Sequence, residues 1–278
     1  MPELPEIYNL ANQMNKELKG KQVAKIESNQ PKNLNMPPDK FAKKIKGKTV
    51  TYVQARGKWL FIKLEPDYYL LINLGMNGDL LYFSPKRTPP ERYHFKLEFT
   101  DKTGFTAGFQ WFGYIHLVAE KDLAKHKLTG KLGITPTDKQ FTLEHFKQLL
   151  AKKKSRIKNF LLEQRNVAGI GNVYIQDTLF RARLHPNRKT NTLTPRETTR
   201  LYKAIKDTLN QAIRLGGLAY EKDFYGKHGK LTINKFQAGY KTGKPCPRCK
   251  TPIQKTRTGT TASYICPKCQ PEAPQQPT

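Results

Sequence analysis

The chain opens with Met1-Pro2-Glu3-Leu4-Pro5-Glu6, a stretch that bears on both the fold and the chemistry of the amino terminus. A small second residue usually allows removal of the initiator methionine, which leaves the secondary amine of Pro2 at the terminus. An α-amino group titrates near ~7.7–8.0, so at neutral pH part of it can attack an electrophilic carbon and form an iminium. Glu3 is the nearest carboxyl for proton transfer. A plainer interpretation stays open, in which the prolines begin a helix and the glutamates balance its dipole.

A helix follows directly, because apolar residues recur at helical spacing up to Leu18. Glu6 falls in its first turn, where negative charge suits the helix dipole. The amino terminus is therefore predicted to be held by a packed helix.

Composition favours a polyanionic partner. The 278 residues carry 50 Lys and Arg against 22 Asp and Glu, a formal net charge of +28. The basic residues are spread along the chain and not gathered in one amphipathic helix, so nucleic acid is favoured over a membrane surface. No apolar run is long enough to span a membrane, and a cytoplasmic location is expected.

The four cysteines predict a metal site. Two C-x2-C pairs, separated by sixteen residues, match the spacing of a tetrahedral zinc site built on two turns and a β-hairpin. Two disulfides are the alternative, which a reducing cytosol disfavours. The predicted ligands of one structural zinc ion are Cys246, Cys249, Cys266 and Cys269.

The first half of the chain has the pattern of a β-sandwich or barrel. Turn signals such as Pro66-Asp67 and Asn77-Gly78-Asp79 separate short runs rich in β-branched and aromatic residues. The predicted strands are 48–54, 58–64, 68–74, 93–99 and 113–118.

The second half is predicted to be helical, with helices at 141–151, 156–163, 173–181 and 195–215. The glycine-punctuated segment 167–172 launches the third of them, and N–H groups at a helix start can bind an anion. A basic run that includes Lys153 and Lys158 lies just before it, which fits contact with a DNA backbone.

In this order, the motifs resemble those of the Fpg/Nei family of bifunctional DNA glycosylases, and PELPE resembles the formamidopyrimidine-DNA glycosylase branch. The match covers nearly the whole chain, with the RGK turn, LGMNG, FG, VAGIGNVY and the zinc finger. The resemblance implies an α+β fold: an N-terminal antiparallel β-sandwich with an N-terminal helix, a helix–two-turns–helix domain and a C-terminal zinc-finger hairpin. DNA would bind in the cleft between the domains.

The resemblance also implies roles for individual residues. Pro2 is similar to the amine that attacks the sugar C1′, and Glu3 to the general acid that opens the sugar ring. Lys58 is similar to the lysine that contacts a phosphate and takes part in β-elimination. The remaining implied DNA contacts are the apolar wedge pair Met76 and Phe112, the backbone-gripping Lys153, Lys158 and Asn172, and also Glu6 and His94.

Two positions depart from the family pattern. Gln110 stands where relatives usually carry an arginine that reads the base opposite the lesion. Thr261 stands where relatives with this zinc finger usually carry an arginine that grips phosphates and is linked to δ-elimination; the nearest arginine is Arg257. These departures leave opposite-base preference and δ-elimination open.

The implied domains are a catalytic sandwich (1–120), a hinge (121–140), the helix–two-turns–helix domain (141–217), a partly mobile loop (218–245), the zinc finger (246–270) and a disordered tail (271–278). The implied function is excision of oxidised purines (8-oxoguanine, formamidopyrimidines) from double-stranded DNA by a monomer, with nicking at the abasic site through a Pro2 Schiff base. Two alternatives stay open: an endonuclease VIII-like enzyme for oxidised pyrimidines, and a non-catalytic binder of damaged or abasic DNA.

Overall fold

The computed structural model describes residues 1–272, which form two compact units. Unit 1 comprises Met1–Lys131 and Ile213–Lys230, and unit 2 comprises Leu132–Ala212 and the chain from Leu231 onward. The segment 218–245 is thus divided between the units. Most of the tail predicted to be disordered lies outside the described residues.

Unit 1 contains two antiparallel four-stranded sheets, which confirms the predicted fold class. The strands of the first sheet, in spatial order, are β2 (Thr49–Arg56), β3 (Trp59–Glu65), β4 (Tyr68–Asn73) and β8 (Tyr114–Ala119). Those of the second are β1 (Val23–Ser28), β6 (Phe95–Phe99), β7 (Gly104–Gly108) and β5 (Asp79–Phe83).

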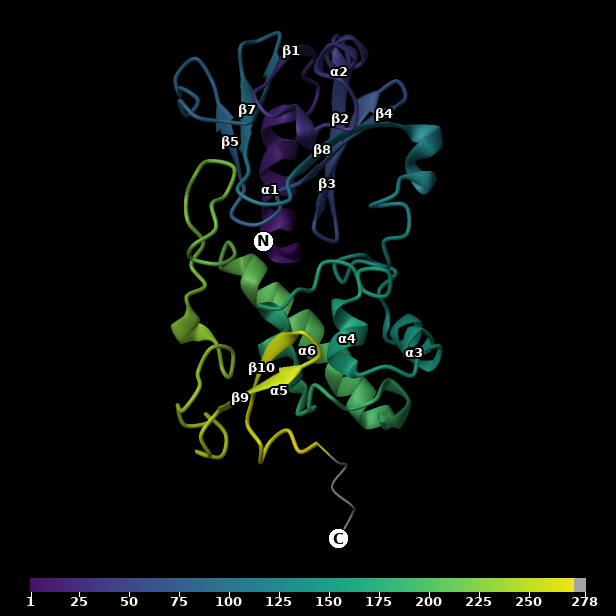
Figure 1. Cartoon of the computed structure of the whole chain (residues 1–278), viewed down its shortest axis with the longest axis vertical. Helices are drawn as coiled ribbons and strands as arrows, with labels where there is room; N and C mark the ends of the chain where they lie inside the picture. Colours follow the sequence, from purple (N-terminus) through teal and green to yellow (C-terminus); the bar gives the residue numbers. More distant parts are fainter. Residues whose placement is uncertain (273–278) are drawn as a thin grey trace. The chain divides into compact units, whose positions relative to one another are not determined.

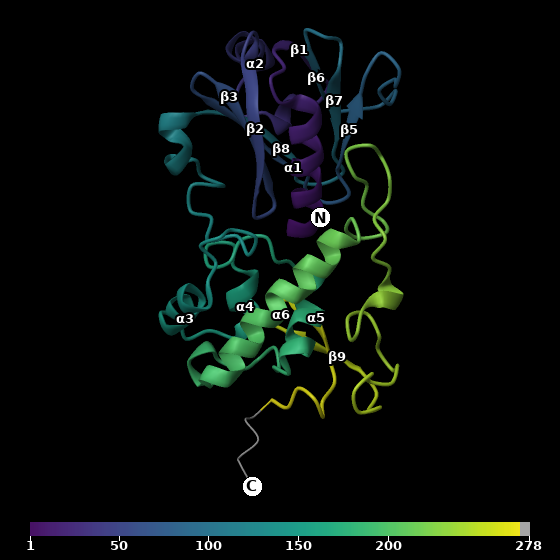
Figure 2. The same ribbon diagram turned by 180° about the vertical axis from the view of Figure 1, so that it is seen from behind.

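The core of unit 1 is shared by both sheets and by helix α1 (Leu4–Leu18). Ile7 and Met14 of α1 are fully buried in one cluster with Leu60 of β3 and Phe99 of β6. In both views α1 lies between strands of the two sheets (Figures 1 and 2). A short helix, α2 (Pro38–Ile45), adds Phe41 and Ile45 to the cluster. The start of α1, and with it the amino terminus, is therefore held by the main core.

Unit 2 is helical, as the change of period predicts. Its helices are α3 (Leu143–Ala151), α4 (Ile157–Leu162), α5 (Tyr174–Ala182) and α6 (Pro195–Arg214), whose last two residues are assigned to unit 1. Its hairpin is formed by β9 (Gln254–Thr258) and β10 (Thr261–Ile265). Phe146, Phe160 and Tyr174 are fully buried. No helix among the described residues is long and apolar enough to cross a membrane.

The segment 218–245, expected to be a partly mobile loop, is anchored within each unit. In unit 1, Gln13 of α1 donates a hydrogen bond to Asp223 (2.9 Å) and accepts one from the Phe224 amide (2.8 Å). In unit 2, the Asp177 carboxylate accepts hydrogen bonds from three consecutive amides, those of residues 237–239. The sequence did not show these anchors, because they join residues far apart along the chain.

We expect unit 1 to lose stability in mild acid because of a histidine pair. His116 Nδ1 lies 2.9 Å from His126 Nε2, and burial, together with the neighbouring His126, lowers the pKa of His116 to about 4. The unfolded chain therefore binds more protons between pH 6.5 and 4, so the free energy of unfolding falls as the pH drops through this window. Urea denaturation at pH 7 and pH 5 measures the loss. His116→Gln should shrink it, whereas the control His228→Gln, at an exposed position, should not.

Candidate active site and nucleic-acid interface

Glu3 is fixed at the first turn of α1. Its backbone N–H donates to Glu6 Oε2 (2.9 Å), and its carbonyl accepts from the Ile7 amide (3.1 Å). The Glu3 side chain is only 2% exposed, and Pro2 is buried. The local sequence favours this arrangement, because proline suits the first helical positions and a carboxylate three residues into the helix can cap its start. Pro2 and Glu3 are thus held in fixed positions at the start of α1.

Glu6 has a structural part in this site. Its Oε1 accepts a hydrogen bond from the Leu218 amide (3.0 Å), and the side chain is 4% exposed. A Cβ at Gly217, which has φ +87°, would lie 2.7 Å from the same oxygen, so glycine is required there. We therefore correct the expectation that Glu6 contacts DNA: both of its oxygens are engaged inside unit 1.

A second buried carboxyl, Glu221, was not identified from the sequence. It is 7% exposed, and its Oε1 lies 3.9 Å from the terminal nitrogen of Met1. Burial raises the pKa of Glu221, the terminal amine opposes this shift, and Glu3 adds to it. The only signal in the sequence is that Glu221 and Asp223 are the two acidic residues of the lysine-rich segment 216–244.

Lys58 lies in the two-residue turn between β2 and β3, next to Gly57, which has φ +60°. The Asn73 side chain donates to the Lys58 carbonyl (2.8 Å) and accepts from the Gly75 amide (3.0 Å). Asn73 is 7% exposed. It therefore fixes the lysine turn to the loop that carries Met76.

Three large apolar side chains extend from two paired loops. The Met76 amide donates to the Trp111 carbonyl (2.8 Å), and a Cβ on Gly75 would lie 1.9 Å from that oxygen. Met76, Trp111 and Phe112 are 45%, 61% and 69% exposed. The two predicted wedge residues thus occur on joined loops, and Trp111 accompanies them.

Gln110 and His94 lie near these loops, and both have partners. Gln110 is exposed, and its Oε1 accepts a hydrogen bond from Asn77 (2.8 Å). His94 Nδ1 accepts from the Phe109 amide (2.8 Å), and its ring stacks on that of Phe109. The bond at Nδ1 leaves Nε2 as the nitrogen available to a ligand.

In unit 2, Asn172 precedes α5 and is half-buried. Gln176 links it to the zinc-finger hairpin by donating to Asn172 Oδ1 (3.2 Å) and to the Ala262 carbonyl (3.1 Å), while accepting from the Tyr264 amide (3.0 Å). Lys153, just after α3, is exposed.

Lys158 does not fit the predicted contact with a phosphate. It is 0% exposed, and its Nζ donates to the Ala262 carbonyl and to Ser263 Oγ (2.9 Å). Burial lowers its pKa to about 8. The lysine instead holds α4 against strand β10. Sequence reasoning missed this because a buried lysine inside a basic run has no distinguishing pattern.

We expect Lys158→Met to leave the salt dependence of DNA binding unchanged. Each phosphate contact contributes about 0.9 to the slope of log K against log salt, and Lys158 should contribute none. The matched control Lys153→Met should reduce the slope by about that amount. Fluorescence anisotropy titrations at several salt concentrations measure both slopes, and hydrogen exchange at β10 should accelerate only in Lys158→Met. An equal reduction of the slope in the two variants would contradict the structural role of Lys158.

Thr261 begins β10 beside the hairpin loop. Its hydroxyl donates to the Thr258 carbonyl (3.3 Å), and Arg257 pairs with Ala262 across the hairpin. Arg257 is exposed. The hairpin therefore presents an arginine one strand away from the position where relatives usually carry one.

The four cysteines fit a structural zinc ion. Their Sγ atoms all lie within 4.8 Å of one another, as a tetrahedral site requires, since Zn–S bonds of about 2.3 Å put the sulfurs about 3.8 Å apart. None of them is in a disulfide. The Arg248 amide donates to Cys246 Sγ and the Cys269 amide to Cys266 Sγ, both at 3.4 Å. The two C-x2-C turns thus form one zinc finger.

The two-sheet unit with its buried acidic amino terminus, and the helical unit that ends in a zinc finger, match family models of DNA glycosylases. Three family models match: the formamidopyrimidine-DNA glycosylase N-terminal domain at residues 1–110, the formamidopyrimidine-DNA glycosylase H2TH domain at 132–223, and a zinc finger found in FPG and IleRS at 243–271.

Complete relatives agree with these domain matches. The formamidopyrimidine-DNA glycosylase of Pelotomaculum thermopropionicum is 38% identical over 97% of this chain and 99% of its own, and that of Shouchella clausii is 34% identical over 98% and 99%. A Lactococcus lactis Fpg bound to DNA containing N7-benzyl-Fapy-dG superposes with a TM-score of 0.86 at 32% identity, covering 97% of this chain and 100% of that one. The chain belongs to the formamidopyrimidine-DNA glycosylase family.

Proposed function

We propose that the protein excises oxidised purines from double-stranded DNA and then cuts the strand as an AP lyase, acting as a monomer. The observation that carries the proposal is the buried amino terminus, where Glu3 is fixed beside Pro2 and Glu221 lies near the terminal amine. Removal of Met1 would expose the Pro2 amine as the nucleophile.

The reaction follows from this arrangement. The Pro2 nitrogen attacks C1′ of the damaged nucleotide, the bond from C1′ to the base breaks, and the base leaves with the proton that the attacking amine loses. Glu3 donates a proton to the ring oxygen as the sugar opens, which gives an iminium between Pro2 and C1′. Loss of a proton from C2′ then expels the 3′ phosphate by β-elimination, and we assign the phosphate contact to Lys58. Hydrolysis of the iminium returns the amine.

The DNA contacts are proposed from exposure and position. Lys153 and Asn172 would hold the backbone, and Met76 and Phe112 would enter the base stack when the damaged nucleotide is flipped out. Thr261 offers a neutral hydroxyl where arginine would give a charge-assisted hydrogen bond, so we propose a larger share of β- than of δ-elimination product.

The preference for purines rests on the relatives. One solved structure contains MutM with DNA bearing carbocyclic 8-oxo-G, and another contains the Lactococcus lactis protein with FAPY-dG DNA. A third contains that protein with DNA bearing an oxidised pyrimidine, which makes pyrimidine excision the second candidate. Single-turnover excision from matched duplexes, each with one lesion, separates the two. Faster release of 8-oxoguanine and formamidopyrimidine than of any oxidised pyrimidine is the expected result, and the reverse order would favour the second candidate.

We expect weak discrimination of the base opposite the lesion, because glutamine offers both donors and an acceptor. Gln110 could therefore pair with cytosine, adenine or thymine, depending on how its amide group is oriented. In one of these orientations, the Gln110 oxygen accepts a hydrogen bond from the Asn77 side chain. Excision of 8-oxoguanine opposite each of the four bases measures the preference. Gln110→Arg should sharpen it toward cytosine by about 1–3 kcal/mol, by analogy with a bidentate base contact. A strong cytosine preference that Gln110→Arg leaves unchanged would mean that another residue recognises the base opposite the lesion, and Trp111 would be the first alternative.

A further inference from the structure

Unit 2 contains a concentration of arginine that the proposed reaction does not use. Lysine supplies most of the positive charge, and only 13 of the 50 basic residues are arginine. Six of these line two adjoining hollows of about 860 and 640 Å³, which share four of them. We name this region the arginine hollow; its arginines are Arg181, Arg183, Arg188, Arg196, Arg200 and Arg248.

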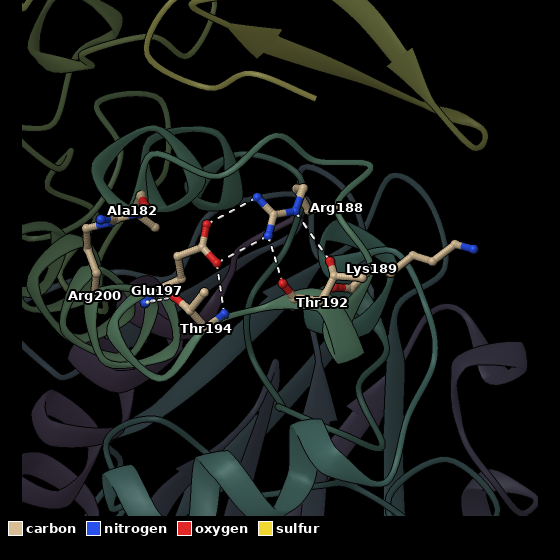
Figure 3. A network of polar contacts seen from close by, with 7 residues as sticks. All are labelled: Ala182, Arg188, Lys189, Thr192, Thr194, Glu197 and Arg200. Carbon is tan, nitrogen blue, oxygen red and sulfur yellow. Dashed lines mark hydrogen bonds and ion pairs between the residues drawn. The ribbon is translucent and has the colours of Figure 1, made fainter. Parts of the chain in front are cut away.

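The end of α5 fixes two of these side chains. Arg248 donates from Nη1 to the Phe180 carbonyl (2.9 Å), and its guanidinium lies 4.5 Å from the centre of the Phe180 ring. Arg200 donates from Nε to the Ala182 carbonyl, and Figure 3 shows Arg200 and Ala182 beside the Arg188 network. Both guanidinium groups are therefore held in place before any ligand arrives.

Most of the charge in the arginine hollow is not neutralised. Arg188 is the exception, because it forms a forked pair with Glu197 at 3.1 and 3.2 Å (Figure 3). Among residues 1–272, no carboxylate lies within ion-pair distance of the other five arginines. Burial lowers the pKa of Arg200; Glu197 opposes this shift, and the neighbouring Arg183 and Arg196 add to it. Repulsion between these neighbouring guanidinium groups is relieved when an anion binds.

The arginine hollow is also separate from the residues proposed to hold the damaged duplex. Asn172 precedes α5, whereas Arg183 follows its last turn. At a rise of about 1.5 Å per residue, the two ends of this segment lie roughly 15 Å apart. A ligand in the hollow would therefore meet different side chains.

We propose that the arginine hollow is a second nucleic-acid site, which binds the phosphate backbone of a DNA duplex other than the one undergoing repair. Arginine forks match phosphate oxygens, and cations spread over two joined hollows suit successive phosphates better than a single one. No aromatic residue lines either hollow, so there is no platform for stacking unpaired bases. Binding is therefore to a duplex backbone and independent of sequence. This site goes beyond the proposed function, because the repair reaction does not require it.

The test loads the active site first. The full-length protein is saturated with a short duplex that carries a tetrahydrofuran abasic analogue, and a fluorescent undamaged duplex is then added. Sedimentation velocity reports a complex of protein with both duplexes. The variant Arg183→Gln/Arg196→Gln removes two exposed arginines of the hollow. Arg183 ends α5 as its C-cap, but it does so through its backbone N–H, which the substitution retains. The control Lys139→Gln/Lys235→Gln removes equal charge from exposed positions elsewhere in unit 2.

We expect the arginine variant to bind the second duplex about tenfold more weakly, and the lysine control to change it less than about twofold. Affinity for the first duplex and lesion excision should stay unchanged in both, so failure of this proposal is distinguishable from failure of the proposed function. Three results would overturn it: no complex with two duplexes, equal weakening in the control, or a hollow that binds inorganic tripolyphosphate while the second duplex is not retained.

Discussion

Glu3→Gln should slow base release from an 8-oxoguanine duplex by about 10²- to 10⁴-fold, the usual range for loss of a general acid. An amide has the same shape as the carboxyl but cannot donate a proton to the sugar oxygen. Cleavage of a preformed abasic site should fall much less, because that sugar opens without enzyme. Single-turnover assays on the two substrates measure the difference.

The controls for Glu3→Gln separate chemistry from folding. The capping box at this position has two bonds. The Glu6 carboxylate accepts from the Glu3 backbone N–H, which the substitution retains, and the Glu3 side chain accepts from the Glu6 backbone N–H, which the amide oxygen of glutamine can also do. Glu65→Gln, at an exposed position of unit 1, should leave both reactions unchanged. Equal loss of base release and of abasic-site cleavage in Glu3→Gln would mean that Glu3 is not the acid that opens the sugar.

Removal of zinc should abolish tight DNA binding while leaving most of the helical content in place. β9 and β10 have five residues each, and a hairpin this short is marginal without further support. Its support is a small cluster in which Cys246 and Cys266 pack with Ile253 and Phe180. Metal binding and folding are therefore coupled in the finger.

Cys266→Ser and treatment with a chelator are two independent ways to remove the metal. Metal analysis should give one zinc per chain before removal, and circular dichroism should change little afterwards. DNA affinity should fall by at least about 100-fold, because the hairpin and its contacts through Gln176 and Lys158 lose their fixed positions. A metal-free protein with oxidised cysteines and full activity would contradict this account of the finger.

Much of the fold could be predicted from periodicity and turn chemistry. The helix that begins near Pro2 and the four helices of unit 2 lie within about two residues of their predicted bounds. Three strands were missed for local reasons. β7, Gly104–Gly108, has glycine at both ends, β5 starts inside a turn signal, and β1 is half polar. Pairing within the sheet stabilises these strands, and propensity alone does not predict it.

The candidate site was predictable where its residues are adjacent in sequence, and not where the fold brings them together. The Pro2-Glu3 pair and the cysteine spacing identify their sites directly. By contrast, Glu221 lies far along the chain and reaches the amino terminus only because α1 binds the segment after α6. Lys158 and Glu6 were given DNA contacts because burial cannot be seen in a short motif, and both are internal in the structure.

Borohydride trapping on a duplex with one abasic site tests the central claim most directly. Reduction converts the iminium into a stable amine, so the protein becomes joined to DNA through its nucleophile. Mass spectrometry of the trapped amino-terminal peptide should place the adduct on Pro2 in protein that has lost Met1. Chain that keeps Met1, or that carries an added residue before Pro2, should give no adduct under the same conditions. An adduct on Lys58, or equal trapping by the blocked chain, would contradict the assignment of Pro2 as the nucleophile.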